Sequence, residues 1–187
     1  MANEKHVRLL KLGTAEWNFA RAQRYDFKPD LAGADLQDLD LQYVNLTQAD
    51  LKGVNLRKAV LIGAIFGDGE AHNGISGPSW VDLSNADLTE ADLTSADLGR
   101  EHGYKGLCLR GAKLCRAKLR YANLNSSDLA GADLTDADLT GAKLADVSFK
   151  NALVVGANFT AAQYMKSGQL WNAKTDARTI LPSYLDL

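Results

Sequence analysis

Large apolar residues recur at every fifth position over most of this chain. The positions 31 to 66, 83 to 98 and 109 to 164, taken in steps of five, give 24 units, and Leu occupies 19 of their centres. Ala stands two residues before the centre in 16 units, and the residue between the two is usually Asp or Asn. Because this repetition dominates the sequence, the fold follows from the repeating unit and not from separately assigned elements.

A period of five fits neither a helix nor a long strand. On an α-helix, five residues advance about 500°, so the Leu residues would form no face. In a flat strand, an odd period would place successive Leu residues on opposite faces. A short strand followed by a corner points Ala and Leu inward and the intervening Asp outward. Four such units, each turning about 90°, close one square coil, and stacked coils pair at about 4.8 Å. The sequence therefore predicts an all-β solenoid.

The units themselves resemble a known family. The stretch ADLTEADLTSADL at 86–98 and the later ADLTD and ADLTG units are similar to those of pentapeptide-repeat proteins over residues 29–164. This resemblance implies a right-handed quadrilateral parallel β-helix of about six coils, with a short N-terminal α-helical cap. The opening HVRLLKLGTAEWNF resembles the helical lead-in of members that are numerous in cyanobacteria, and ARTILPSYLDL resembles a tail common in that group.

Three segments are expected. Residues 1–28 form a helical cap and lead-in, residues 29–164 form the β-helix, and residues 165–187 form a capping tail. Both ends of a coil stack expose apolar core and unpaired strand edges, so both need covering. Gly13 is expected to bend or split the helical segment, and Trp17 and Trp171 are interpreted as cap residues. The other apolar residues expected to cover the C-terminal end are Leu170, Ile180, Leu181, Tyr184 and Leu185.

Two breaks interrupt the repeat. Residues 67–80 are rich in Gly and contain Pro78, which indicates a protruding loop. Residues 99–106 are either a one-residue bulge with Tyr104 as a poor centre or a six-residue excursion. Loops on a rigid scaffold commonly carry function. The residues expected to bind a partner are therefore Asp68, His72, Trp80, His102 and Tyr104.

Composition narrows the function classes. Among 187 residues, 21 Lys and Arg oppose 23 Asp and Glu, for a formal charge of −2, so direct nucleic-acid binding is not expected. The mean hydropathy is −0.21, and no apolar run approaches the roughly 20 residues needed to span a bilayer. The start of the chain lacks signal-peptide features, so a cytoplasmic location is expected, with Cys108 and Cys115 reduced.

Basic residues concentrate at 100–120, where seven bases oppose only Glu101. Stacking each unit on the fourth unit before it predicts ion pairs Lys113–Asp133, Arg116–Asp136 and Lys118–Asp138 between neighbouring coils. Such surface pairs contribute about 0–1 kcal/mol each. The alternative is a basic surface for an anionic partner, although these bases would be spread around the coil. We therefore prefer the interpretation that these bases form ion pairs between neighbouring coils.

No catalytic constellation is evident. The many Asp residues are evenly spaced and equivalent, whereas acid–base catalysis needs two groups with distinct pKa values. Asp68, Glu70 and His72 alternate in a manner compatible with metal ligands, but a solvated loop is the simpler interpretation. We therefore predict no enzyme activity, cofactor or metal.

The function expected from the sequence is a protein–protein interaction or scaffold module, as a monomer or an end-to-end dimer, with no membrane contact. The family resemblance implies an alternative, a DNA-mimicking modulator of DNA gyrase or topoisomerase. That alternative calls for a more anionic surface than a net charge of −2 supplies.

Overall fold

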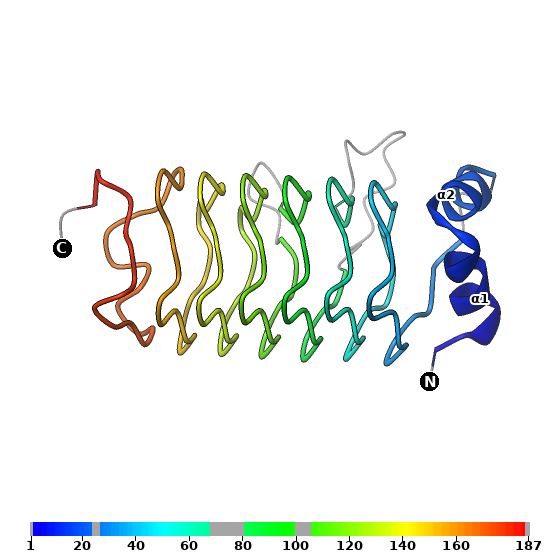
Figure 1. Cartoon of the computed structure of the whole chain (residues 1–187), viewed down its shortest axis with the longest axis horizontal. Helices are drawn as coiled ribbons and strands as arrows, with labels where there is room; N and C mark the ends of the chain where they lie inside the picture. Colours follow the sequence, from blue (N-terminus) through cyan, green and yellow to red (C-terminus); the bar gives the residue numbers. More distant parts are fainter. Residues whose placement is uncertain (1, 24–26, 68–80, 100–105, 186–187) are drawn as a thin grey trace.

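The chain forms a rod of stacked coils in a computed structural model of all 187 residues (Figure 1). The structure describes residues 2–23, 27–67, 81–99 and 106–185. Two helices lie at one end of the rod, and the chain termini lie at opposite ends (Figure 1). Each turn of the rod adds one coil along its axis.

The coils have four sides, each held by a column of parallel bridges between outward-facing residues. The first side joins Asp30, Asp50, Asp82, Cys108, Asp128 and Ser148. The second joins Asp35, Asn55, Asp87, Lys113, Asp133, Leu153 and Lys174. The third joins Asp40, Val60, Asp92, Lys118, Asp138, Asn158 and Ile180. The fourth joins Asn45, Ile65, Asp97, Asn123, Lys143 and Gln163. In uninterrupted coils, such as those that join Asp30 to Asp50 and Asp128 to Ser148, each bridge therefore spans four units of the repeat.

The corners between sides explain the polar residues of the repeat. From Leu31 to Phe159, wherever the structure describes it, the second residue after a centre adopts a left-handed conformation, as at Asp38 with φ 58° and Gly131 with φ 68°. Gly, Asn and Asp accept this conformation at the lowest cost. The outward Asp also accepts the amide two residues further on: Asp92 Oδ1 accepts from the Thr94 amide at 3.1 Å and from its hydroxyl at 2.6 Å. Asp is therefore preferred because it closes the corner that follows it.

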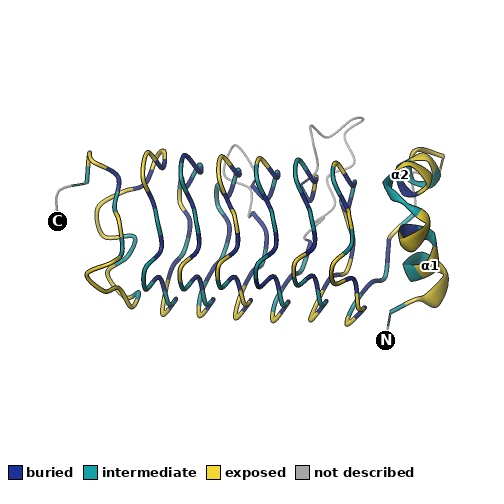
Figure 2. Cartoon of the chain, in the orientation of Figure 1, coloured by how far each residue is buried: buried dark blue, intermediate teal, exposed yellow. Residues whose placement is uncertain are grey.

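Leu and Ala fill the interior. Except for the partly buried Leu39, the inward Leu and Ala side chains between Leu31 and Ala162 are almost completely buried, whereas the corners are exposed (Figure 2). The centre predicted at Tyr164 is wrong, because this side chain is 62% exposed. The backbone at Tyr164 has φ 62°, and Met165 takes the buried place next to it at 4% exposure. The inward pattern thus ends one unit earlier than the sequence indicated.

Two helices cover the N-terminal end. They are α1 (Glu4–Leu12) and α2 (Thr14–Ala22), separated by Gly13 with φ 137°. Leu10 and Trp17 are buried, and Trp17 Nε1 donates to the Asn45 carbonyl at 2.7 Å. The helices therefore attach to the first coil through both apolar packing and side-chain hydrogen bonds. No helix in the described part of the chain has the length and apolar character needed to cross a membrane.

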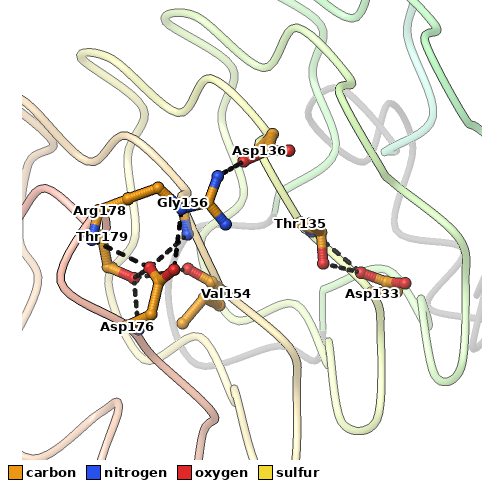
Figure 3. Close-up of polar contacts among 8 residues, drawn as sticks. All are labelled: Asp133, Thr135, Asp136, Val154, Gly156, Asp176, Arg178 and Thr179. Carbon is orange, nitrogen blue, oxygen red and sulfur yellow. Dashed lines mark hydrogen bonds and ion pairs between the residues drawn. The ribbon is translucent and has the colours of Figure 1, made fainter.

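The C-terminal segment extends two of the four sides. Lys174 and Ile180 continue the second and third columns. At the corner between them, Asp176 Oδ1 accepts the Gly156 amide at 3.0 Å, where a further coil would have offered a carbonyl (Figure 3). Arg178 joins Asp176 at 2.9 Å and Asp136, two coils back, at 2.8 Å (Figure 3).

The interpretation of Trp171 as a cap residue is wrong. Its side chain is 87% exposed, and Ile180 and Tyr184 are also more than half exposed. Leu170, Leu181 and Leu185 are partly buried against the core instead. The end is closed largely by polar contacts, including the Tyr184 hydroxyl, which donates to the Ala162 carbonyl at 2.8 Å.

Candidate interaction surface

The two breaks in the repeat are insertions at the same corner of the rod. On the first side, Asp30 bridges to Asp50, which is the regular spacing of one coil. Asp50 then bridges to Asp82, so the coil that contains the first break is longer than a regular coil by more than half. Asp82 then bridges to Cys108, which shows a shorter insertion at the second break. Asp87–Lys113, Asp92–Lys118 and Asp97–Asn123 keep this same offset on the other three sides. Residues 99–106 are therefore a six-residue excursion and not a one-residue bulge.

The stems of these loops lie side by side. Both loops begin directly after a fourth-side unit, at Gly67 and Gly99, and end where the first side resumes. The Gly67 amide lies 3.4 Å from the Asp97 carbonyl. A Cβ atom placed on Gly67 would lie 2.8 Å from the Gly99 carbonyl oxygen, so the two loops leave adjacent coils in contact.

The next coil fixes the second loop. The Gly106 amide donates to the Ser126 carbonyl at 3.0 Å. Ser127, which occupies a buried inward position, donates its hydroxyl to the Leu98 carbonyl at 2.9 Å. In regular units that carbonyl accepts the amide three residues on, as Leu93 does from Ala96 at 3.0 Å. Ser127 therefore supplies a hydrogen bond to this carbonyl at the point where the chain leaves the coil.

The predicted partner-binding residues all belong to these two loops. Asp68, His72, Trp80, His102 and Tyr104 lie outside the described residues, as does Glu70. The structure thus brings together the stems that carry them. It adds one apolar residue that the sequence analysis missed, Ile65, which faces outward on the fourth side two residues before the first stem and is 38% exposed.

The basic residues of 108–127 form ion pairs, but not with the partners expected. The predicted pairs Lys113–Asp133, Arg116–Asp136 and Lys118–Asp138 are wrong. Lys113, Arg116 and Lys118 point back one coil to Asp87 at 3.9 Å, Glu90 at 2.5 Å and Asp92 at 3.2 Å. Arg110 and Arg120 point forward to Asp128 at 2.5 Å and Asp138 at 3.3 Å. These bases are therefore engaged in joining neighbouring coils.

The described side chains offer little reactive chemistry. Burial raises the pKa of the Cys108 thiol. Burial and the neighbouring Asp133 raise the pKa of the Cys115 thiol to about 11. A thiol with a raised pKa is protonated at neutral pH and is a weak nucleophile. Among the described residues, no group of three or more His, Cys, Asp or Glu is placed to hold a metal ion.

A four-sided coil stack built from Ala-Asp-Leu units defines a repeat protein of the β-solenoid class. A sequence model of pentapeptide repeats matches residues 30–68, 79–100 and 108–145 in 8 copies. This match covers more than half of the chain, and the chain belongs to the pentapeptide-repeat family.

Solved structures include similar proteins. A pentapeptide repeat protein from the thylakoid lumen of Arabidopsis thaliana shares 27% identity over 75% of this chain and 70% of its own, with a TM-score of 0.45. One from the cyanobacterium Cyanothece 51142 shares 22% over 88% of this chain and 97% of its own, with a TM-score of 0.42. QnrB1, a plasmid-mediated fluoroquinolone resistance protein, shares 16% over 83% of this chain and 68% of its own, also with a TM-score of 0.42. No curated protein sequence matches the chain.

Proposed function

We propose that this chain, as a right-handed β-helix of about six coils, is a non-catalytic interaction or scaffold module. Its two loops together form the surface that binds a protein partner. The observation that carries this proposal is the contact between the loop stems at Gly67 and Gly99. Two insertions from successive coils of one rigid corner can be recognised together by a single partner.

The apolar composition of the coil interior is consistent with a function carried out by the outer surface. The buried described side chains of the coils are apolar except for Thr89 and Ser127. The Ser127 hydroxyl is already bonded to the Leu98 carbonyl. An interior packed with Ala and Leu provides rigidity, which lowers the entropic cost of holding two loops in a binding arrangement.

The gyrase alternative is less well supported. It depends on an anionic surface, and five bases of 108–127 interrupt that surface with ion pairs on the first three sides. A gyrase supercoiling assay discriminates the two functions, because the scaffold proposal expects no effect on supercoiling at about micromolar protein. Inhibition or protection of gyrase would favour the alternative.

The scaffold proposal is tested by restoring the uninterrupted repeat. Replacing 67–80 and 99–106 each by the dipeptide Thr-Gly returns both coils to the regular spacing of the columns. The partner is first isolated from native extract with the full chain and purified. Its dissociation constant for the loopless variant is then measured.

The expected result is loss of binding in the loopless variant and weakening by Trp80→Ala or Tyr104→Ala. The matched control is Trp171→Ala, which removes an exposed aromatic side chain at the far end of the rod. Circular dichroism confirms that each variant keeps the β-helix. Unchanged binding by the folded loopless variant would refute the proposal.

A further inference from the structure

The first coil has a strand edge that is only half covered. In the other coils, the amide of an outward residue donates to the coil before it, as Asn55 does to the Ala34 carbonyl at 2.9 Å and Val60 to the Leu39 carbonyl at 2.9 Å. The first coil has no coil before it. Its outward residues therefore need other partners for both the amide and the carbonyl.

The helical cap supplies those partners on two sides. On the first side, the Asp30 amide donates to His6 Nδ1 at 3.0 Å, and the Asp30 carbonyl accepts the Asn3 amide at 3.0 Å. On the fourth side, the Asn45 amide donates to Asn18 Oδ1 at 2.9 Å, and its carbonyl accepts Trp17 Nε1 at 2.7 Å. Cap side chains thus take the place of a missing coil on these sides.

The second and third sides are left open. Within the described part of the chain, neither the amide nor the carbonyl of Asp35 or Asp40 has a hydrogen-bond partner. Both residues are exposed. Leu39, which stands where most units have Ala, is only partly buried. A strand edge with free donors and acceptors is a template for an added extended segment.

The charge at this edge specifies the kind of segment. Asp35, Asp38 and Asp40 line it, and no Lys or Arg occurs between residues 30 and 50. The same spacing and the same two sides recur at Asp87, Glu90 and Asp92. Those three acids are paired with Lys113, Arg116 and Lys118, which follow the second side, the corner and the third side of the next coil.

A basic segment can pair from the N-terminal side of such acids as well. Arg120, one coil before Asp138, reaches the Asp138 carboxylate at 3.3 Å on the third side. Bases of one coil therefore form ion pairs with acids of the coil before it and with acids of the coil after it. The first-coil acids therefore face a position from which, elsewhere in the molecule, an Arg reaches an acid of the next coil.

We propose that the edge formed by residues 35–42 binds a basic segment of a partner protein by strand addition, with the segment following the second side, the corner at Asp38 and the third side. The segment carries Lys or Arg at the five-residue period of the coils, two residues after the positions over Asp35 and Asp40, as Arg110 and Arg120 stand relative to Asp128 and Asp138. It carries a small or apolar residue beside Leu39. This surface is distinct from the loop corner, and the proposal does not depend on the loops.

The test uses a fluorescent synthetic peptide with the sequence of residues 110–120, in which Ser replaces Cys115. Binding to the full chain is followed by fluorescence anisotropy. Asp35→Asn with Asp40→Asn should weaken binding about tenfold, since each exposed charge pair contributes up to about fivefold. The control, Asp50→Asn with Asp82→Asn, removes equal charge from the first side and should change the dissociation constant less than about twofold. Asn is compatible with these positions, as Asn55 and Asn45 show.

Backbone pairing is tested separately from charge. The Asp35 and Asp40 amides should exchange hydrogen more slowly when the peptide is bound, and a peptide N-methylated at alternate residues should not bind. The loopless variant should bind the peptide as the full chain does, which separates this proposal from the loop function. No binding at about 100 μM peptide, or equal loss in both double variants, would overturn it. A chain dimer that Asp35→Asn with Asp40→Asn dissociates would also overturn it, because the occupant would then be a second copy.

Discussion

The ring of Tyr121 lies against Gly141, the residue at the same corner one coil further along the rod. A Cβ atom placed on Gly141 would lie 2.6 Å from both Cδ1 and Cε1 of the Tyr121 ring. Tyr43 and Gly63 repeat this arrangement with the same two distances. Both tyrosines are exposed, so the glycine provides the flat backbone surface on which an exposed ring rests.

Gly141→Ala should therefore destabilise the protein more than Gly131→Ala does. The two glycines have φ 69° and 68°, but a Cβ on Gly131 would meet no atom within 4 Å. Both substitutions cost about 1 kcal/mol for a left-handed Ala, a conformation that Ala161 already adopts. The clash with the ring adds about 1–3 kcal/mol at Gly141, measured as the free energy of unfolding in urea.

The second substitution Tyr121→Ser provides the control for this effect. In the Gly141→Ala background it removes the ring, and the stability should return to that of Gly131→Ala. Equal free energies of unfolding for the two single variants would show that the ring does not rest on Gly141.

The repeat itself was predictable, because one steric argument governs every unit. Ala and Leu must share the narrow interior, and the residue between them must point out, which assigns inward and outward positions from Leu31 to Phe159. The ion pairs were not predictable by the same rule. Stacking by four units correctly pairs the backbones of Lys118 and Asp138, but the long Lys118 side chain leans to Asp92 in the coil before.

The corner at which both loops leave the rod could be predicted from the sequence. Phe66 and Leu98 are the eighth and twelfth centres, so with four units a coil both loops follow a fourth side. The placement of side chains such as Trp80 could not be predicted from the sequence, because residues 67–80 lack the five-residue repeat that assigns inward and outward positions. The open edge at Asp35 was missed as well, since it depends on which first-coil groups the cap side chains reach.

Ser127→Ala should destabilise the protein, although Ala is the usual residue at this position of the repeat. The substitution removes the hydrogen bond to the Leu98 carbonyl, which has no other hydrogen-bond partner among the described residues. The expected loss is about 1–3 kcal/mol in the free energy of unfolding. Ser148→Ala, at a partly exposed outward position, is the control and should change stability by less than about 0.5 kcal/mol. A neutral or stabilising Ser127→Ala would contradict the role assigned to this hydroxyl.

Stability should fall in acid because several carboxylates are bound in the folded state. Burial opposes ionisation of Asp92 and Asp133, but hydrogen bonds from Thr94 and Thr135 outweigh it and lower both pKa values from 3.8. The hydrogen bond from Arg116 lowers the pKa of Glu90 from 4.5. A group with a lowered folded pKa stabilises the protein above its unfolded pKa, and this contribution is lost as the pH falls through the folded value.

The melting temperature should therefore hold steady near neutral pH and drop as the pH falls below about 5. Asp92→Asn with Asp133→Asn should reduce the steepness of that drop, since Asn keeps the corner hydrogen bonds without titrating. Asp35→Asn with Asp40→Asn is the control that removes equal charge elsewhere on the same two sides. An unchanged acid profile in the Asp92 and Asp133 variant would contradict the assignment.

Asp176 closes the C-terminal end by standing in for a further coil, and Asp176→Ala should open that end. The change removes the acceptor of the Gly156 amide and one of the two carboxylates that hold Arg178. The amides of Lys174 and Ile180, which donate to the Ala152 and Ala157 carbonyls, should then exchange hydrogen faster, together with a loss of about 1–2 kcal/mol in stability. Asp146→Ala is the control, because Asp146 is an exposed carboxylate paired with the exposed Lys166. If exchange at Lys174 and Ile180 responds equally to both substitutions, the end is closed by the apolar contacts of Leu170 and Leu181 and not by Asp176.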